Sequence, residues 1–353
     1  MKYRLDDLLG LALHEGASDL HLRVGSPPVL RLQGSLVPVE GPALEEADTE
    51  FLASELCTPE QMRRVAAVGQ VDGARGHGAA DRFRLHVFRA GGGYGLVLRL
   101  LPCLVPDLRT LGLPPEVVEL LERPRGLFLV TGPTGSGKTT TLASMVDWMN
   151  RHRSGHILTI EDPVEYRHAH GRCLVTQREP GVDVADFASA VRAALRQDPD
   201  VLLVGEMRDL ETIQAAVTAA ETGHLVLATL HTTGAVRTVD RIVDAFPAAT
   251  REEVRIQLAS SLLAVVSQVL CARVDGGRQA AFEVMVATTA IAQQIRENRT
   301  FRIHSDLQTG GRHGMIPLDS SLRQLVERGH ISRAEALRRA QRPDELSGQL
   351  AGT

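Results

Sequence analysis

The residues best suited to chemistry form a glycine-rich stretch that ends in a lysine and two threonines. Residues 132–140 read Gly-Pro-Thr-Gly-Ser-Gly-Lys-Thr-Thr, and they fit the pattern G-x-x-x-x-G-K followed by Ser or Thr at every fixed position. Glycines let the backbone wrap closely around phosphate oxygens, and backbone N–H groups at the start of a helix stabilise the negative charge. The stretch therefore predicts a P-loop that binds ATP.

This loop supplies the predicted ligands of the nucleotide. The Lys138 ammonium is expected to reach the β- and γ-phosphates, and the Thr139 hydroxyl is expected to ligate Mg²⁺. The predicted nucleotide-binding residues are Gly132, Pro133, Thr134, Gly135, Ser136, Gly137, Lys138, Thr139 and Thr140.

Two acidic segments supply carboxylates for hydrolysis, which needs one to activate water and others to hold Mg²⁺. The first contains Glu161 and Asp162, the second contains Glu206, and each follows a short apolar run. Ligands of open parallel sheets bind beyond the carboxyl ends of the strands, so both segments should face the P-loop.

We predict Glu206 as the leading catalytic carboxylate. Gly205 stands where many P-loop enzymes carry a metal-binding Asp. Glu161 and Asp162 are therefore the predicted magnesium ligands beside Thr139, and Glu161 is a second catalytic candidate. In the alternative, Glu206 only caps the helix that follows, where an acidic group favours the helix dipole.

Two histidines border the next predicted strand. His224 begins it and His231 lies just beyond its carboxyl end, where a polar side chain can sense the γ-phosphate. His231 therefore joins the predicted catalytic residues. The spacing of the two histidines fits no metal-binding pattern. In the alternative, both side chains only hydrogen-bond to nearby backbone.

Alternating strands and helices must position these groups. Short apolar, β-branched runs predict strands at 127–131, 157–160, 201–204 and 225–229. Helical patterns fall between them, at 138–150, 186–197, 208–222 and 236–245. Such alternation predicts an α/β domain with a mostly parallel sheet. After residue 250 the pattern predicts mainly helices, at 250–270, 288–297, 317–329 and 332–341.

The first 101 residues predict a separate, small α+β unit. Helical spacing occurs at 5–14 and twice within 49–68, and alternation at 18–22 predicts a strand with one buried face. A Gly-rich stretch at 69–81 predicts a loop, and the runs at 82–89 and 94–101 predict a hairpin. Residues 102–113 contain two prolines and a glycine and predict a linker to a second domain, 114–353.

Composition weighs against several other classes of protein. The chain of 353 residues has a formal net charge of −4 and 3% aromatic residues, without a dense run of Lys or Arg, which disfavours nucleic-acid binding. No stretch approaches the ~18 apolar residues that cross a bilayer, so we expect a cytoplasmic protein. The cysteines are scattered, which favours reduced thiols over a zinc site. They are Cys57, Cys103, Cys173 and Cys271.

Four motifs together resemble those of the secretion and pilus motor ATPases. In chain order they are Gly-Pro-Thr-Gly-Ser-Gly-Lys-Thr-Thr, Ile-Glu-Asp-Pro-Val-Glu, Gly-Glu-Met-Arg-Asp and the segment around His231. They correspond to the Walker A, Asp box, Walker B and His box of that superfamily. Ala-Ser-Asp-Leu-His-Leu at 17–22 and Ala-Phe-Glu-Val-Met at 281–285 resemble the PilT-type retraction ATPases within it. The resemblance covers nearly the whole chain.

This resemblance implies a PAS-like N-terminal domain and a RecA-like ATPase domain with a helical C-terminal region. It also implies a homohexameric ring that lies peripheral to the inner membrane, on its cytoplasmic face, and acts on a pilus platform protein to retract a type IV pilus. Arg84 and Arg99 match strands whose arginines approach the γ-phosphate in the superfamily, which makes them predicted catalytic residues. In the alternative, these arginines are ordinary exposed strand residues.

One departure from the PilT-type pattern keeps other functions open. These ATPases typically carry a segment close to Ala-Ile-Arg-Asn-Leu-Ile-Arg-Glu, which is associated with retraction. Residues 290–297 keep its ends but have Ala292 at the third position and Gln294 at the fifth. An accessory retraction ATPase, or a motor for a secretion or DNA-uptake pseudopilus, therefore remains an alternative. A nucleotide-dependent scaffold without useful turnover is the alternative of another class.

Overall fold

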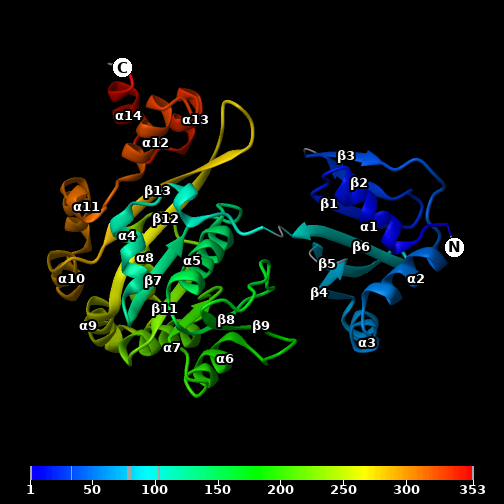
Figure 1. Cartoon of the computed structure of the whole chain (residues 1–353), viewed down its shortest axis with the longest axis horizontal. Coiled ribbons are helices and arrows are strands. Elements are labelled where there is room, and N and C mark those ends of the chain that lie inside the picture. Colours follow the sequence, from blue (N-terminus) through cyan, green and yellow to red (C-terminus); the bar gives the residue numbers. More distant parts are fainter. Residues whose placement is uncertain (1, 33, 78–80, 102–103, 352–353) are drawn as a thin grey trace. The chain divides into compact units, whose positions relative to one another are not determined.

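The computed structural model describes residues 2–32, 34–77, 81–101 and 104–351, which form two compact units (Figure 1). The first unit comprises Met1–Leu104 and Glu165–Arg167, and the second comprises Val105–Val164 and His168–Thr353. Residues 102–103 of the predicted linker lie outside the described residues.

A six-stranded antiparallel sheet forms the body of the first unit, in the order β3-β2-β1-β6-β5-β4. Its strands are β1 (Asp19–Arg23), β2 (Val29–Leu32), β3 (Ser35–Pro38), β4 (Gln70–His77), β5 (Asp81–Ala90) and β6 (Gly93–Leu101). Its helices are α1 (Leu5–His14), α2 (Glu46–Leu56) and α3 (Pro59–Val68). Leu9, Leu52 and Val65, one from each helix, pack with Phe83 and Leu85 of β5 in a single core, so the helices cover one face of the sheet.

The structure confirms most elements predicted for this unit and corrects one. The helix at 5–14, the strand at 18–22 and the hairpin that leads into residues 94–101 are present. The loop predicted at 69–81 is wrong, because β4 occupies most of it and pairs with β5. β4 lies at the edge of the sheet, where polar residues can stay in water while the backbone pairs on one side. Residues 78–80 lie outside the described residues.

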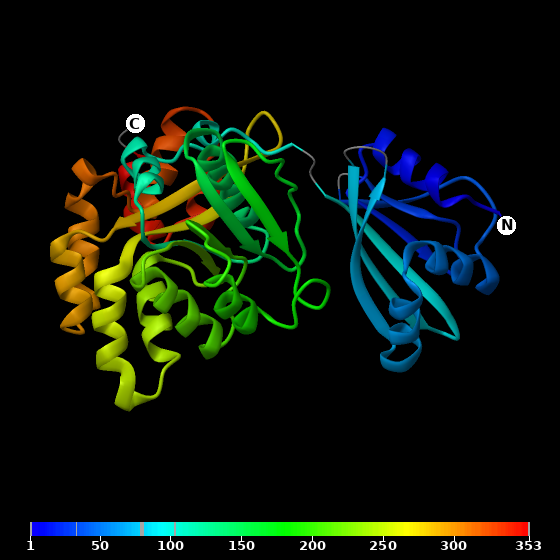
Figure 2. The same cartoon turned by 60° about the horizontal axis from the view of Figure 1, so that its bottom comes forward.

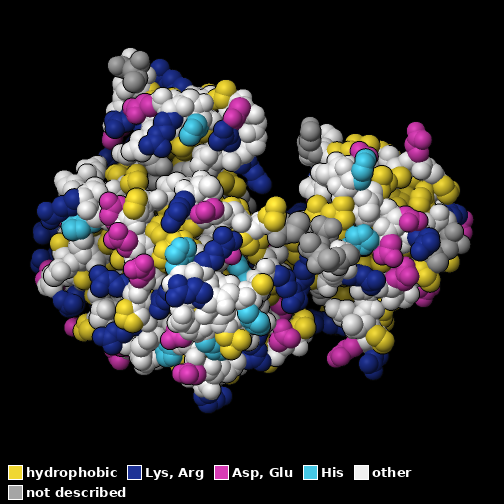
Figure 3. Space-filling model, viewed as in Figure 1, with side chains coloured by type: hydrophobic (Ala, Val, Ile, Leu, Met, Phe, Trp, Pro, Cys, Tyr) yellow, Lys and Arg dark blue, Asp and Glu magenta, His cyan; other side chains and the backbone are white. Residues whose placement is uncertain are grey.

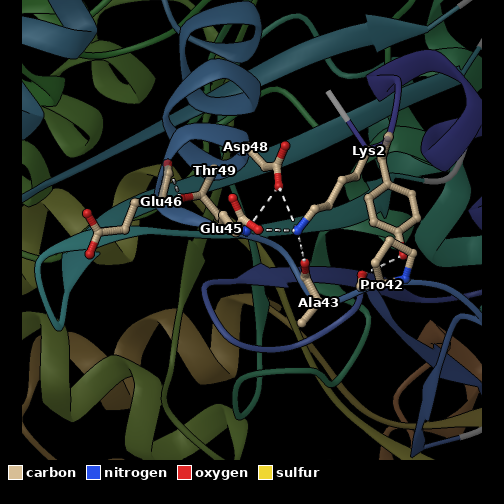
Figure 4. A network of polar contacts seen from close by, with 8 residues as sticks. Lys2, Pro42, Ala43, Glu45, Glu46, Asp48 and Thr49 are labelled. Carbon is tan, nitrogen blue, oxygen red and sulfur yellow. Dashed lines mark hydrogen bonds and ion pairs between the residues drawn. The ribbon is translucent and has the colours of Figure 1, made fainter.

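A polar network ties the start of the chain to the start of α2 (Figure 4). Lys2 Nζ donates to Glu45 Oε1 at 2.7 Å and to Ala43 O at 2.9 Å, and it lies 3.9 Å from Asp48 Oδ2. Asp48 also accepts the Glu45 N–H at 3.0 Å. The two acidic side chains complement the positive end of α2.

A seven-stranded sheet forms the centre of the second unit, in the order β13-β12-β7-β11-β10-β8-β9. Its strands are β7 (Gly126–Thr131), β8 (Gly155–Ile160), β9 (Cys173–Arg178), β10 (Val201–Val204), β11 (Leu225–Leu230), β12 (Leu262–Ala272) and β13 (Arg278–Val286). All neighbouring pairs are parallel except β12 with β13.

Helices cover both faces of this sheet (Figures 1 and 2). They are α4 (Pro115–Glu119), α5 (Lys138–His152), α6 (Phe187–Ala194), α7 (Leu210–Glu221), α8 (Ala235–Asp244), α9 (Arg251–Ser261), α10 (Thr289–Arg296), α11 (Ile303–Thr309), α12 (Leu318–Glu327), α13 (Arg333–Arg339) and α14 (Pro343–Gln349). Alternate residues of β7 face opposite cores: Leu127 and Leu129 pack in the core of α6–α9, whereas Phe128 and Val130 pack with α5. The predicted α/β class is confirmed.

One predicted helix of this unit is wrong in its second half. Residues 250–270 contain α9, but β12 begins at Leu262 and runs through the rest of the segment. β12 pairs with β7 on one side and β13 on the other, and most of its residues are buried. A strand covered on both faces is apolar throughout and shows no alternation, so its periodicity does not distinguish it from a buried helix. The prediction also missed β9 and β13.

The C-terminal helices α12, α13 and α14 pack on the β12–β13 hairpin (Figure 1). Leu322, Ile331 and Leu346 form a small core there with Cys271 and Ala281. This fourth core joins the end of the chain to the β12–β13 hairpin, whose strand β12 lies beside the predicted P-loop strand β7.

The described cysteines are buried thiols. Cys57, Cys173 and Cys271 are free, and burial raises the pKa of each thiol, for Cys271 to about 11. Thiols that stay protonated at neutral pH are poor metal ligands and poor nucleophiles. Cys103 lies outside the described residues.

The surface carries charges of both signs. Lys and Arg side chains are interspersed with Asp and Glu on the visible face of the second unit (Figure 3). Across the described ranges, no helix combines the length and the apolar character that a bilayer span requires.

Candidate nucleotide site

The P-loop connects β7 to α5 and needs glycine at two positions. Gly132 has a φ of +139°, and a Cβ there would lie 2.3 Å from the carbonyl oxygen of Gln268 in β12. Gly137, with a φ of +89°, is the N-cap of α5. Glycine adopts such angles at little cost. The loop can therefore hold its backbone N–H groups close to an anion.

Lys138 is the first residue of α5, and its ammonium lies within the loop. It is 9% exposed and donates to Gly132 O at 2.9 Å and to Pro133 O at 3.1 Å. Burial lowers the pKa of the ammonium, while the negative charge of Glu206 opposes that shift. The amine thus lies where the predicted phosphate contacts require a cation.

The Glu206 carboxylate, just beyond β10, is engaged at both oxygens. Oε1 lies 2.9 Å from His231 Nε2, and Oε2 lies 2.7 Å from Arg208 Nε. The alternative role of Glu206 as a helix cap is not what the structure shows. Asp209 caps α7 instead, because its Oδ1 accepts the Thr212 N–H at 2.8 Å.

His231 joins this carboxylate to the P-loop. Its Nδ1 lies 3.4 Å from Lys138 Nζ and 3.5 Å from Thr134 Oγ1, while its Nε2 faces Glu206. A cavity of about 330 Å³ lies beside the cluster and is lined by Glu206, Met207, Arg208, Leu230, His231, Thr232 and Arg241. A single imidazole therefore contacts both the loop and the predicted catalytic carboxylate.

Glu161 follows β8, the strand that pairs with β10. Its Oε1 accepts the Thr159 hydroxyl at 2.7 Å and the Gln177 amide at 3.2 Å. The Gly205 N–H donates to Ile160 O at 2.7 Å, and a Cβ on Gly205 would lie 2.9 Å from that oxygen. Glycine at position 205 thus permits a close approach of the two strand ends, which a residue with a side chain would separate.

The predicted magnesium ligands present oxygen atoms, the donors that Mg²⁺ prefers. The Thr139 hydroxyl makes no hydrogen bond within the described part of the chain, and Asp162 is exposed. Together with Glu161 they offer one hydroxyl and two carboxylates, which is the donor chemistry that a magnesium site requires.

His224 differs from His231. It lies at the amino end of β11, and its Nδ1 is 3.0 Å from Ala219 O. For this histidine, the structure therefore shows the local backbone contact that was the alternative to a role in sensing the γ-phosphate.

Comparison with known proteins shows which family the chain belongs to. The family described as Type II/IV secretion system protein matches residues 4–344. The chain belongs to this family. It is 46% identical over 342 residues to the type IV pilus retraction ATPase PilT of Pseudomonas aeruginosa, a match that covers 97% of this chain and 99% of PilT. The type IV pilus ATPase PilU of the same organism is 37% identical, over 97% of this chain and 90% of PilU.

A solved structure extends the likeness to three dimensions. The crystal structure of the pilus retraction motor PilT with bound ADP matches with a TM-score of 0.93 and 43% identity, over 98% of this chain and 100% of that one. The predicted resemblance to PilT-type ATPases is confirmed, as is the predicted two-domain fold class. This chain is therefore a nucleotide-binding ATPase.

The two predicted catalytic arginines lie opposite each other on β5 and β6 of the first unit. Arg99 donates from Nε to Asp19 Oδ1 at 2.8 Å, yet its side chain is 65% exposed. Arg84 is half-buried, and its side chain has no ion pair or hydrogen bond among the described residues. Within the described ranges, the pair therefore consists of one arginine held by a carboxylate and one whose side chain has no polar partner.

We expect Asp19→Asn to destabilise the first unit at neutral pH. Burial raises the pKa of Asp19, but hydrogen bonds from Ser18 and Arg99 outweigh it, so the pKa lies below its ordinary value. A lowered carboxyl pKa stabilises the fold above the unfolded pKa of ~3.9, and this is lost as the pH falls through the folded pKa. Losing these charged hydrogen bonds should cost ~1–3 kcal/mol at pH 7.

Hydrogen exchange of β1 and β6 in the intact chain measures this effect. The matched control is Asp72→Asn, which removes a charge from a carboxylate that is 58% exposed and contacts His86. The difference from the unaltered protein should shrink below pH ~4 for Asp19→Asn. Equal protection of the two variants at pH 7 would contradict the prediction.

Gln268, for which the sequence predicts no role, holds the P-loop from the neighbouring strand β12. It is 1% exposed on β12, and its Nε2 donates to Ser136 O at 2.6 Å while its Oε1 accepts the Thr141 hydroxyl at 2.9 Å. It thus bridges the loop and the first turn of α5. The available signal was a pair of polar residues, Ser267 and Gln268, within an otherwise apolar run.

Gln268→Ala is therefore expected to lower nucleotide affinity without contacting the nucleotide. The loop would lose two buried hydrogen bonds, worth ~1–3 kcal/mol, so affinity should fall about tenfold or more. Titration with a fluorescent ADP analogue measures it. Gln279→Ala on β13, which removes a contact to Arg273, is the matched control. Affinity equal to that of the control would show that the loop holds its shape without Gln268.

Proposed function

We propose that this chain is the ATP-hydrolysing motor that retracts a type IV pilus. In this proposal it works as a homohexameric ring at the cytoplasmic face of the inner membrane and acts on a pilus platform protein, without binding nucleic acid. The names of its relatives support the retraction function. The proposal that it hydrolyses ATP rests on one observation. The His231 ring contacts both Glu206 and Lys138 and so links the predicted catalytic carboxylate to the P-loop.

The proposed hydrolysis follows from these contacts between Glu206, His231 and Lys138. Lys138 would exchange its carbonyl contacts for the β- and γ-phosphates, where a fixed cation stabilises the charge that develops on the transferred phosphoryl group. Glu206 would orient the attacking water and accept its proton. His231 would report whether a γ-phosphate is present, because it contacts both groups. Mg²⁺, held by Thr139 with Glu161 and Asp162, would neutralise phosphate charge.

The arginines of the first unit would complete the site. A cation that is not neutralised locally is available to a phosphate, and Arg84 fits this description better than Arg99, which Asp19 holds. In the proposed cycle, ATP draws the first unit toward the P-loop unit and hydrolysis releases it, so the two arginines convert phosphate chemistry into domain motion.

Retraction in a deletion strain tests the proposal. Pili should extend but not retract without the protein, and the unaltered gene should restore retraction while the Glu206→Gln gene should not. If pili still retract in the deletion strain and stop only when a second retraction ATPase is also deleted, this protein would instead be an accessory retraction ATPase. That alternative draws support from Gln294, which donates to Asp306 at a position where the PilT-type pattern has leucine.

Turnover separates a motor from a nucleotide-dependent scaffold. The Glu206 carboxylate, which His231 links to Lys138 of the P-loop, supports hydrolysis over mere binding. Steady-state phosphate release from the purified protein should exceed that of the Glu206→Gln variant. Equal, negligible rates at saturating ATP would favour the scaffold.

A further inference from the structure

Glu283 is a buried carboxylate of the second unit that the proposed chemistry does not use. It lies on β13 opposite Ser267 of β12 and is 3% exposed. A buried carboxylate is retained at a cost unless its oxygens are hydrogen-bonded. Its two partners therefore indicate what it does.

One oxygen of Glu283 holds the start of α8. Oε1 accepts the Ala235 N–H at 2.6 Å, and the neighbouring Gly234 N–H donates to Ser267 Oγ at 2.9 Å. Gly234 is the N-cap of α8 and has no side chain with which to serve the free N–H groups of the first turn. The sheet supplies the cap instead, and it thereby fixes the end of the short segment that begins at His231.

The other oxygen holds the C-terminal helices. Oε2 accepts the Gln341 amide at 2.7 Å. The backbone N–H groups of Gln341 and Arg342 both donate to the Asp319 carboxylate, at 2.8 and 2.9 Å. Asp319 belongs to α12, so Gln341 connects Glu283 to the segment that joins α13 to α14.

The junction has room to rearrange. A cavity of about 120 Å³ lies beside it, and its polar lining includes Glu283, His304, Asp319, Gln341 and Arg342. Tightly packed apolar contacts would resist a shift of one element against another. At Glu283 and Gln341 the contact is instead made by hydrogen bonds beside a cavity, next to the small apolar core of the C-terminal helices, and hydrogen bonds can change partners.

We propose that Glu283 and Gln341 form a positioning link between the nucleotide site and the C-terminal helices. A shift of residues 231–234 on nucleotide binding moves Ala235 relative to β13, and the same carboxylate carries that change to Gln341. The C-terminal helices thus respond to the nucleotide held by the P-loop. This inference rests on the proposed role of His231 in sensing the γ-phosphate.

Hydrogen exchange of the full chain, with and without a non-hydrolysable ATP analogue, tests the link. In the unaltered protein, exchange should change both at residues 223–236 and at residues 318–349. In Gln341→Ala the change at 318–349 should be lost while that at 223–236 persists, because Glu283 still caps α8. Gln324→Ala, an exposed change on α12, is the matched control and should behave as the unaltered protein.

Variants of Glu283 separate its two contacts. Glu283→Gln keeps an oxygen for the Ala235 N–H, and its amide can pair with a flipped Gln341, so it should retain the response that Glu283→Ala loses. The KM of the Gln341→Ala variant for ATP should equal that of the unaltered protein. An equal KM would show that the nucleotide site of this variant is folded.

The outcomes distinguish the link from the function on which it rests. An unchanged nucleotide response at 318–349 in Gln341→Ala overturns the link and leaves the motor function intact. The same is true if the unaltered protein responds only at 223–236. A failure of residues 223–236 to respond in the unaltered protein overturns the sensing role of His231 and the link with it.

Discussion

Replacing Lys138 by alanine is expected to reduce ATP turnover by ~10²–10³-fold, because the loop loses the cation that stabilises phosphate charge in the transition state. The ammonium lies 2.9 Å from Gly132 O and 3.1 Å from Pro133 O, within the loop that would surround the phosphates. Nucleotide affinity should fall as well. Steady-state phosphate release and nucleotide titration measure the two effects.

The composition of the chain provides an internal control for this prediction. Lys2 and Lys138 are its only lysines. Lys2→Ala should leave turnover unchanged, because the contacts of Lys2 to the described residues lie at the start of α2 in the first unit. In the unaltered protein, ATP should protect the Lys138 amine from acylation while Lys2 remains reactive. Full turnover in Lys138→Ala, or equal acylation of Lys138 with and without ATP, would contradict the assignment.

Replacing Glu206 by glutamine is expected to leave ATP binding intact and to slow hydrolysis by ~10²–10⁴-fold, the range typical of a lost general base. The amide keeps the shape of the side chain and one oxygen for Arg208 or His231, but it does not accept a proton from water. Single-turnover hydrolysis by pre-bound ATP isolates this step from binding and product release.

Two further variants sharpen the assignment of Glu206. Glu211→Gln removes a carboxylate that is 74% exposed on α7 and should have no effect on turnover. Glu161→Gln tests the competing carboxylate, and if Glu161 binds only magnesium, its loss should be partly offset by raising the magnesium concentration. A larger fall in single-turnover rate for Glu161→Gln than for Glu206→Gln at saturating magnesium would exchange the two roles.

Local patterns are enough to predict a candidate nucleotide site, because the physical causes of these patterns are local. The nine residues of the P-loop are contiguous, and their glycines, lysine and threonine act through one turn of backbone and the helix that follows it. The strands at 127–131 and 201–204 could be predicted because short apolar runs that alternate with helices indicate the strands of an α/β sheet. Glu206, Glu161 and His231 followed from one rule, that polar residues at the carboxyl ends of parallel strands meet at one edge.

Residues that act across the fold could not be predicted in this way. Gln268 reaches the P-loop because β12 lies beside β7, yet the two strands are far apart in the chain. The apolar pattern of that segment predicts the end of a helix, which gives its side chains no neighbours on β7 or β13. The same strand order brings Ser267 and Glu283 to the start of α8, more than thirty residues away in sequence.

The sequence alone determined the family of the chain and predicted the phosphate site and the carboxylates available to it, since each depends on short runs whose geometry is set by neighbouring residues. Only the tertiary structure decided that His231 contacts Lys138 and Glu206 together, that Asp209 and not Glu206 caps α7, and that β12 is a strand. The reason is the order of strands in the sheet. Which strand lies beside which is settled by packing over the whole unit, and it determines which distant side chains share one site.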